Sequence, residues 1–117
     1  LEPAAADDPL FADVPTPFTT LHWHRYSCEP PAGAVPLART WSALQAFRIG
    51  ERSWGVQFHG EVGGELAELW ARRGAGALRA QGIDPEDVIA GATRDLSIQR
   101  RVAESIAGGF GRVVAAT

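Results

Sequence analysis

Hydrophobic residues in this chain change their spacing once, near residue 61, and that change constrains the fold more than any other feature. Before it, β-branched and aromatic residues favour strands over 37–41, 44–50 and 54–59, separated only by very short joins. Strands joined so closely pair as an antiparallel meander. After it, apolar residues recur at helical spacing. This order predicts an α/β protein in which a β-meander is followed by helices.

The regions on either side of these strands differ in composition. Residues 1–17 are rich in Pro, Ala and Asp and predict an irregular lead-in. Residues 18–27, with the sequence FTTLHWHRYS, are a further strand candidate, and the prolines of 28–36 interrupt it because proline lacks a backbone donor. We therefore expect strands within 18–61 and a helical tail over 62–117.

Local signals place the ends of the predicted helices. Helical spacing relates Leu66, Leu69, Trp70 and Arg73, and Gly74 follows as a stop. A second helix has a strong start, with Asp84 as N-cap, a proline at the first helical position and two acidic residues in the first turn. Helical spacing continues over 97–107, and the pair Gly108-Gly109 is expected to weaken the tail.

Composition narrows the classes of function. The chain has 117 residues, a formal net charge of -3 and 45% hydrophobic residues, within the range of one soluble domain. Its basic residues form no stripe and no apolar run could span a bilayer, so we expect neither nucleic acid nor a membrane as partner. The single cysteine, Cys28, excludes an internal disulfide and favours a reducing, cytoplasmic location. The absence of Met and the start at Leu1 predict a segment of a longer protein.

The strongest candidate for chemistry is the pair His59 and Glu61 at the exit of the predicted third strand. In an extended segment, residues i and i+2 point the same way, so the carboxylate can accept a hydrogen bond from the imidazole Nδ1–H. That bond fixes the tautomer and leaves Nε2 free to act as a base. Gly60 lets the chain turn between them. The alternative is a surface histidine beside a solvated glutamate.

The sequence around this pair resembles a known family. AFRIGERSWGVQFHGEV is similar to the end of the class I (triad) glutamine amidotransferase domain, where an apolar strand runs into Gln-Phe-His-Pro-Glu. Upstream residues also match the GMP-synthase-like members, and the resemblance covers roughly residues 8–70. It implies that residues 1–117 are the C-terminal half of a three-layer, flavodoxin-like α/β domain.

The resemblance also implies a mechanism. The family hydrolyses the side-chain amide of glutamine through a Cys–His–Glu triad and supplies ammonia. His59 would be the base that takes the thiol proton and then gives it to the leaving ammonia, and Glu61 would orient the imidazole. Gln57, on the same strand face as His59, would only pack or form hydrogen bonds. No cofactor and no metal ion is implied.

The third member of the triad is absent from this sequence. The family places its nucleophile in a Gly-x-Cys-x-Gly elbow before a helix, and no such sequence occurs. Cys28 is followed by Glu29 and two prolines, so it is predicted to be a semi-buried thiol and not the nucleophile. The resemblance therefore implies a partner, either the missing N-terminal half or a synthase, with glutamine as substrate of the whole. The chain alone is expected to be inactive.

Other functions stay open. Gly60 in place of the family's Pro, and Arg25-Tyr26 in place of its usual residues, favour a non-catalytic partner-binding relative. A γ-glutamyl hydrolase would use the same triad on a different amide. A cupin-like metal site could draw on His22, His24 and Glu29, together with the histidine of the pair. The alternative for the His-x-His pair is that both side chains lie on one strand face, opposite a packed Trp23. Three tryptophans are expected to pack in the core or at its edge: Trp41, Trp54 and Trp70.

Overall fold

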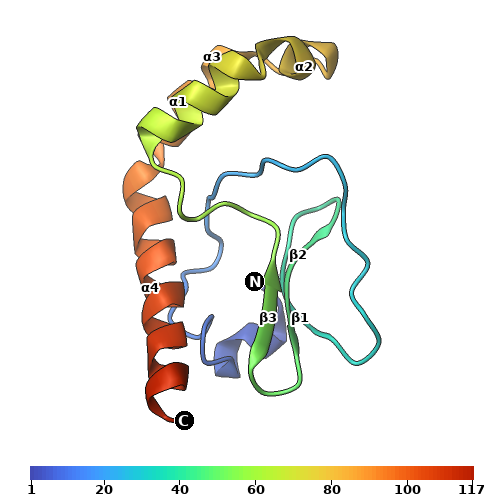
Figure 1. Cartoon of the computed structure of the whole chain (residues 1–117), viewed down its shortest axis with the longest axis vertical. Helices are drawn as coiled ribbons and strands as arrows, with labels where there is room; N and C mark the ends of the chain where they lie inside the picture. The colour runs from blue at the N-terminus through green and yellow to red at the C-terminus, as the bar shows by residue number, and fades with distance from the viewer.

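The computed structural model describes all 117 residues as a small antiparallel sheet followed by four helices (Figure 1). The α/β class and the order of a meander before helices are thus confirmed. No helix combines the length and the apolar character needed to cross a bilayer. The elements are a 3-10 helix η1 (Pro3–Asp7), strands β1 (Val35–Arg39), β2 (Leu44–Ile49) and β3 (Ser53–Val56), and helices α1 (Gly64–Arg73), α2 (Ala75–Ala80), α3 (Pro85–Arg94) and α4 (Leu96–Ala115).

The three predicted meander strands form in the order β1-β2-β3, although β3 ends three residues earlier than expected. Gly50, at a φ of 59°, provides the left-handed residue that the tight turn from β2 to β3 needs. Phe47 of β2 lies opposite Gly55 of β3, and a Cβ on that glycine would lie only 2.6 Å from the Phe47 ring. Gly55 thus allows the aromatic ring to lie across the sheet.

The helix boundaries follow the local signals closely. Helix α1 ends at Arg73, and Gly74 follows as predicted. Helix α3 begins at Pro85, and the side chain of Asp84 accepts a hydrogen bond from the Glu86 N–H at 3.0 Å. Capping of this kind satisfies a backbone donor that has no partner within the helix.

The prediction that Gly108-Gly109 weakens the tail is wrong, because α4 continues through both glycines to Ala115. The reason is tertiary: Gly109 is buried, and a Cβ there would lie 2.4 Å from the carbonyl oxygen of Pro9. The N-terminal segment therefore lies directly against the helix at this point. An ion pair between Arg112 and Asp13, at 3.0 Å, joins the same two segments.

The strand predicted over 18–27 is also wrong. This stretch is irregular apart from one isolated bridge between Leu21 and His59. Its β-branched and aromatic residues favour a strand, but a strand needs a neighbour with free backbone groups along its length. Only His59, just past the end of β3, provides such a neighbour, through a backbone hydrogen bond of 2.8 Å.

Residues 1–17 contribute far more than an irregular lead-in. They contain η1 and supply Ala5, Leu10, Phe11 and Val14, four of the nine residues in the main hydrophobic cluster. The rest of that cluster comes from β1, β2, the exit of β3 and α4. The N-terminal segment thus fills the space between the sheet and α4 (Figure 1).

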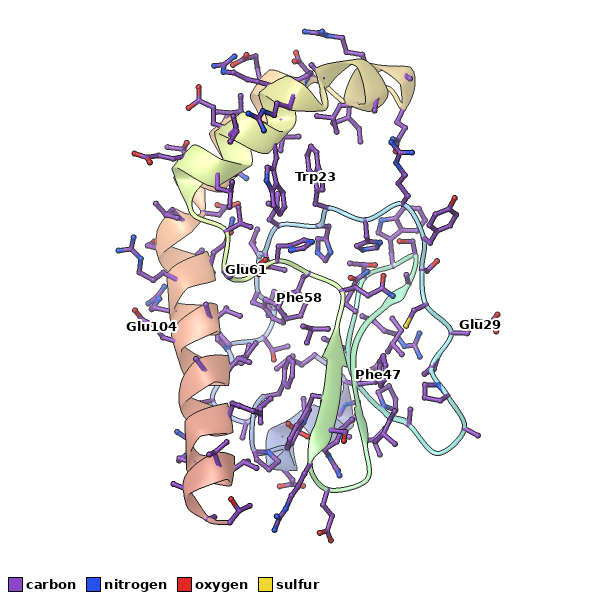
Figure 2. All side chains as sticks on the ribbon, in the orientation of Figure 1. Trp23, Glu29, Phe47, Phe58, Glu61 and Glu104 are labelled. Atoms are coloured by element: carbon purple, nitrogen blue, oxygen red, sulfur yellow. The ribbon has the colours of Figure 1, made fainter.

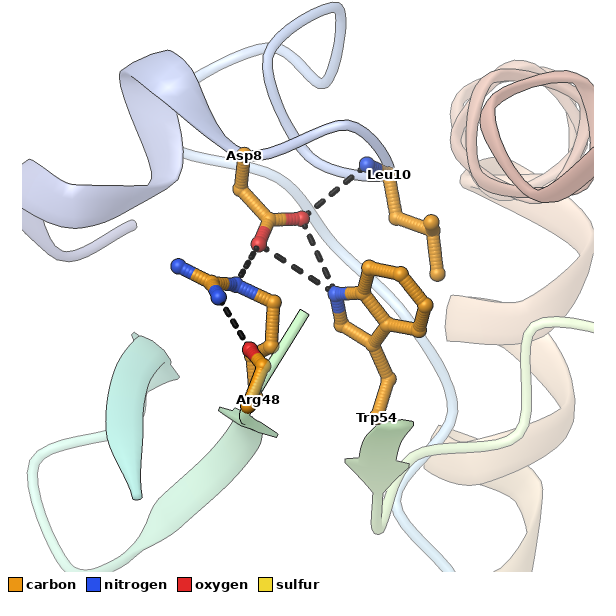
Figure 3. A network of polar contacts seen from close by, with 5 residues as sticks. Asp8, Leu10, Arg48 and Trp54 are labelled. Carbon is orange, nitrogen blue, oxygen red and sulfur yellow. Dashed lines mark hydrogen bonds and ion pairs between the residues drawn. The ribbon is translucent and has the colours of Figure 1, made fainter. Parts of the chain in front are cut away.

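A buried carboxylate holds this segment against the sheet (Figure 3). Asp8 is 1% exposed, and its oxygens accept hydrogen bonds from Arg48 Nε at 2.9 Å, Trp54 Nε1 at 3.2 Å and the Leu10 N–H at 3.0 Å. Arg48 also donates to the carbonyl of Gly50 in the turn. Asp8 therefore links the end of η1 to β2 and β3, and Arg48 extends the network to the turn between these strands.

The helices α1, α2 and α3 form an arm that extends beyond the N-terminal end of α4 (Figure 1). A smaller cluster holds the base of this arm, formed by Leu21, Val62, Ala67 and Ala92. The arm makes the chain elongated, with extents of 44 × 29 × 22 Å.

The Asp8 network predicts a large loss of stability when its acceptor is removed. Asp8→Ala leaves the Arg48 charge and the Trp54 N–H without their partner, so we expect the free energy of unfolding to fall by about 3 kcal/mol. Asp13→Ala is the control, because it removes an exposed ion pair from the same segment and should cost less than about 1 kcal/mol. Urea unfolding of the two variants measures both values, and equal losses would contradict the assigned role.

Two glycines of α4 offer a second test. Gly109→Ala should destabilise the chain by about 1–3 kcal/mol, because the new methyl group forces the Pro9 backbone away. At Gly111 a Cβ would meet nothing within 4 Å, so Gly111→Ala should stabilise the helix by up to about 1 kcal/mol. Thermal unfolding compares the two, and a shift of the same sign in both variants would contradict the close approach.

Candidate functional site

The structure brings His59 and Glu61 together as their spacing predicts. His59 Nδ1 lies 2.8 Å from Glu61 Oε1, within hydrogen-bond distance. The carboxylate can only accept, so the geometry assigns the proton to Nδ1 and leaves the lone pair of a neutral ring on Nε2. The His59 side chain is 30% exposed, which leaves it accessible to a substrate while part of the ring is packed. The pair therefore has the geometry of an oriented general base.

The charge of Glu61 is stabilised by this arrangement. Partial burial is the largest single influence and acts to raise the pKa of Glu61. The hydrogen bond from His59, a backbone hydrogen bond and the charge of His59 act in the opposite direction. Their sum places the pKa of Glu61 below its usual value, so the carboxylate stays ionised at neutral pH.

The ring of Trp70 packs against the imidazole of His59. The two rings meet edge to face, at a centroid distance of 5.2 Å and an interplanar angle of 90°. Trp23 packs against the same indole, with the two ring centroids 5.8 Å apart. Figure 2 shows Trp23 pointing toward the helical arm. The sequence placed Trp70 on a helix, but no local signal could show that this helix turns back over the exit of β3.

The histidines upstream lie nearby but play a different part. His22 Nδ1 is 3.2 Å from Oε1 of the buried Gln45, and its ring lies 6.1 Å from that of His24. Burial lowers the pKa of His22, the hydrogen bond to Gln45 acts to raise it, and the charges of His24 and His59 lower it further. The His22 ring therefore contacts the sheet through Gln45 and does not contact Glu61.

Gln57 holds the segment that contains the cysteine. Its side chain, with the amide oriented to match its neighbours, accepts a hydrogen bond from the Cys28 N–H at 2.7 Å and donates one to the Tyr26 carbonyl at 3.1 Å. Cys28 itself is exposed, so the expectation of a semi-buried thiol was wrong. Exposure results because the irregular segment crosses the surface without any element covering it.

The structure also tests the predicted packing of the tryptophans and the cupin-like metal site. Trp54 and Trp70 pack against the two clusters, but Trp41 is 99% exposed in the turn between β1 and β2, so its predicted packing was wrong. No three His, Cys, Asp or Glu side chains converge closely enough to hold a metal ion, and the cupin-like combination of His22, His24 and Glu29 is not assembled.

The sequence did not reveal that β3 has an unpaired edge near His59. The N–H groups of Gln57 and His59 donate toward β2 and the Leu21 segment, at 2.9 and 2.8 Å. Because backbone groups alternate in direction along a strand, those of Trp54 and Val56 point to the opposite edge. β3 is the last strand of the sheet, so no strand pairs with that edge.

An apolar groove of about 720 Å³ runs between β3 and α4. Its walls include Val56 and Phe110, which are 49% and 52% exposed, and it reaches Gly60 and Glu61 at one end. The periodicity of α4 carries a signal for it, because Ile106 and Phe110 share a face at helical spacing. The sequence could not show that this face of α4 lies opposite β3.

Comparison with models of protein families and with curated proteins finds no match to this chain.

The lowered pKa of His22 predicts a pH dependence of stability. Because the folded-state pKa lies below the unfolded value of 6.5, the unfolded chain binds the proton more readily. The free energy of unfolding should therefore fall as the pH drops below 6.5. Urea unfolding at several pH values between about 7.5 and 5.5 avoids the titration range of the carboxylates. His22→Gln should reduce the fall, and an unchanged pH dependence would contradict the lowered pKa.

Proposed function

We propose that this chain carries the base and the orienting carboxylate of a glutamine amidotransferase. The observation that supports the proposal most directly is the 2.8 Å contact between His59 Nδ1 and Glu61 Oε1 at the exit of a strand. The order of the elements, a meander followed by helices, is compatible with the C-terminal part of a three-layer amidotransferase domain. The resemblance over residues 8–70 supplies the reaction class.

In the proposed reaction, Nε2 of His59 takes the proton of a cysteine thiol, and the thiolate attacks the side-chain carbonyl carbon of glutamine. The imidazolium then gives its proton to the leaving nitrogen, and ammonia departs from the tetrahedral adduct, which leaves a thioester. Water, deprotonated by Nε2 of His59, hydrolyses the thioester to glutamate, and the imidazolium returns that proton to the thiolate. Glu61 holds the imidazole in one tautomer and stabilises its charged form throughout.

The cysteine in this proposal comes from a partner polypeptide or from another part of a longer one. Cys28 is exposed on the irregular segment that Gln57 holds, and no helix follows it, so it does not lie in the elbow before a helix that the family uses for its nucleophile. The unpaired edge of β3 is a suitable place for the incoming segment. A strand paired with Trp54 and Val56 would enter the groove against α4 and end beside His59.

The surface area supports a missing partner. The chain exposes 7411 Å², whereas a monomer of 12.5 kDa typically exposes about 6,200 Å². The excess of about 1,200 Å² is larger than the roughly 800 Å² that each side of a standard interface buries. Only 20 of the 117 residues are buried, and the exposed apolar walls of the groove are surface that a partner would cover.

The test is ammonia release from glutamine by the protein expressed with its natural flanking sequence. His59→Ala should abolish release, because it removes the imidazole that takes the thiol proton in the proposed reaction. Glu61→Gln should reduce kcat by roughly a hundredfold or more, since the neutral amide orients the ring but stabilises its positive charge poorly. Near-normal release by His59→Ala would exclude His59 as the base.

The matched control is Glu65→Gln, an exposed carboxylate in the first turn of α1 that makes no ion pair. It should leave ammonia release unchanged. A protein that binds its partner through the β3 edge but releases no ammonia would instead support the non-catalytic alternative, which Gly60 and Arg25-Tyr26 motivate.

A further inference from the structure

A second concave site lies on the other side of Trp70, and the proposed reaction does not use it. A cleft of about 560 Å³ separates the segment 22–25 from helices α1 and α2. Its principal lining residues are His22, Trp23, His24, Arg25, Trp70 and Arg73. Neither His59 nor Glu61 lines it. Its volume is within the range of small-molecule sites, roughly 300–1,000 Å³, and far exceeds what a simple inorganic ion would fill.

The charge of this cleft is opposite to that of the chain. The chain has a net charge of -3 and 14 acidic residues, yet no carboxylate lines the cleft. Arg25 and Arg73 both line it, and neither takes part in any of the seven ion pairs. By contrast, the next residue on α1, Arg72, is paired with two carboxylates. The two guanidinium groups thus have donors available for an anion.

Two imidazoles also line the cleft, with the ring centroids of His22 and His24 6.1 Å apart. They add polar ring atoms to its wall, whereas its positive charge comes from the two arginines.

The apolar wall of the cleft is aromatic and fixed in place. Trp23 and Trp70 pack at 46° with centroids 5.8 Å apart, and both rings are only partly buried. A Cβ at Gly74 would lie 3.0 Å from Trp23 Cζ2, so the indole is seated directly on the backbone at the end of α1. Indole rings held in this way offer surfaces on which a flat ring can stack.

We propose that this cleft binds a small organic anion in which an aromatic ring carries a phosphate or carboxylate group. The anion would lie between Arg25 and Arg73, and the ring would pack on Trp23 and Trp70. Trp70 also touches His59, so the bound molecule would lie next to the base without entering the groove beside it. This inference is independent of the amidotransferase proposal, because the cleft exists whether or not a nucleophile is supplied.

The experiment follows the indole N–H signals of the 117-residue chain by NMR while probes are added. Adenosine monophosphate carries a ring with a phosphate, and 4-hydroxybenzoate carries a ring with a carboxylate. The probe that binds with the higher affinity identifies the anionic group that the cleft prefers. Adenosine carries the ring alone, and inorganic phosphate the charge alone. We expect one ring-bearing anion to shift the Trp23 and Trp70 signals saturably, and adenosine and phosphate to bind at least tenfold more weakly. The Trp41 and Trp54 signals serve as internal references.

Two variants assign the anion contact. Arg25→Gln and Arg73→Gln should each weaken binding of that probe by roughly tenfold, the loss expected for a charge-assisted hydrogen bond. Arg79→Gln is the control, because Arg79 is exposed on α2, makes no ion pair and does not line the cleft. The exposed positions should leave folding intact, which circular dichroism verifies. Four results would overturn the proposal: no shift with either ring-bearing anion, shifts confined to Trp41, phosphate binding as tightly as the ring-bearing anions, or equal affinity in all three variants.

Discussion

The buried carboxylate of Asp8 is the interaction on which the rest of the structure depends. It accepts hydrogen bonds from Arg48 on β2 and Trp54 on β3, and so holds two neighbouring strands to the N-terminal segment. Once that segment is in place, its apolar residues supply much of the main core and lie against Gly109 of α4. The position of α4 relative to the sheet therefore follows from an ion pair formed at the opposite end of the chain.

Features that depend on a few adjacent residues were predictable from the sequence. The start of α3 at Asp84 and Pro85 and the end of α1 before Gly74 both satisfy backbone groups locally. The uninterrupted α4 and the irregular stretch over 18–27 were not predictable. In each case the deciding contact is distant in sequence. Gly109 is held in a helix by the close approach of Pro9, and 18–27 lacks a strand because only His59 lies opposite it.

The candidate site divides in the same way. The contact between His59 and Glu61 could be predicted because side chains two residues apart in an extended segment point the same way. The ring of Trp70 over His59 could not, because it depends on how α1 returns past the strand exit. The cleft around Arg25 and Arg73 could not be predicted either, because its two walls come from segments far apart in the sequence. Local geometry thus predicted the contact between His59 and Glu61, whereas the residues around it depend on the tertiary fold.

The His59–Glu61 pair contacts both concave regions of the molecule indirectly: Glu61 lines the end of the groove, and His59 touches Trp70, which lines the cleft. On one side, the unpaired edge of β3 offers backbone donors and acceptors, and it carries neither Lys nor Pro, residues that commonly protect an open edge from pairing. A strand that paired with this edge would end near the His59–Glu61 pair, so the proposed docking and the proposed chemistry would share one set of hydrogen bonds. On the other side, Trp70 separates the imidazole from the positively charged cleft. A displacement of that indole by a molecule in the cleft would move the ring that holds His59, which gives the two regions a direct physical connection through one side chain.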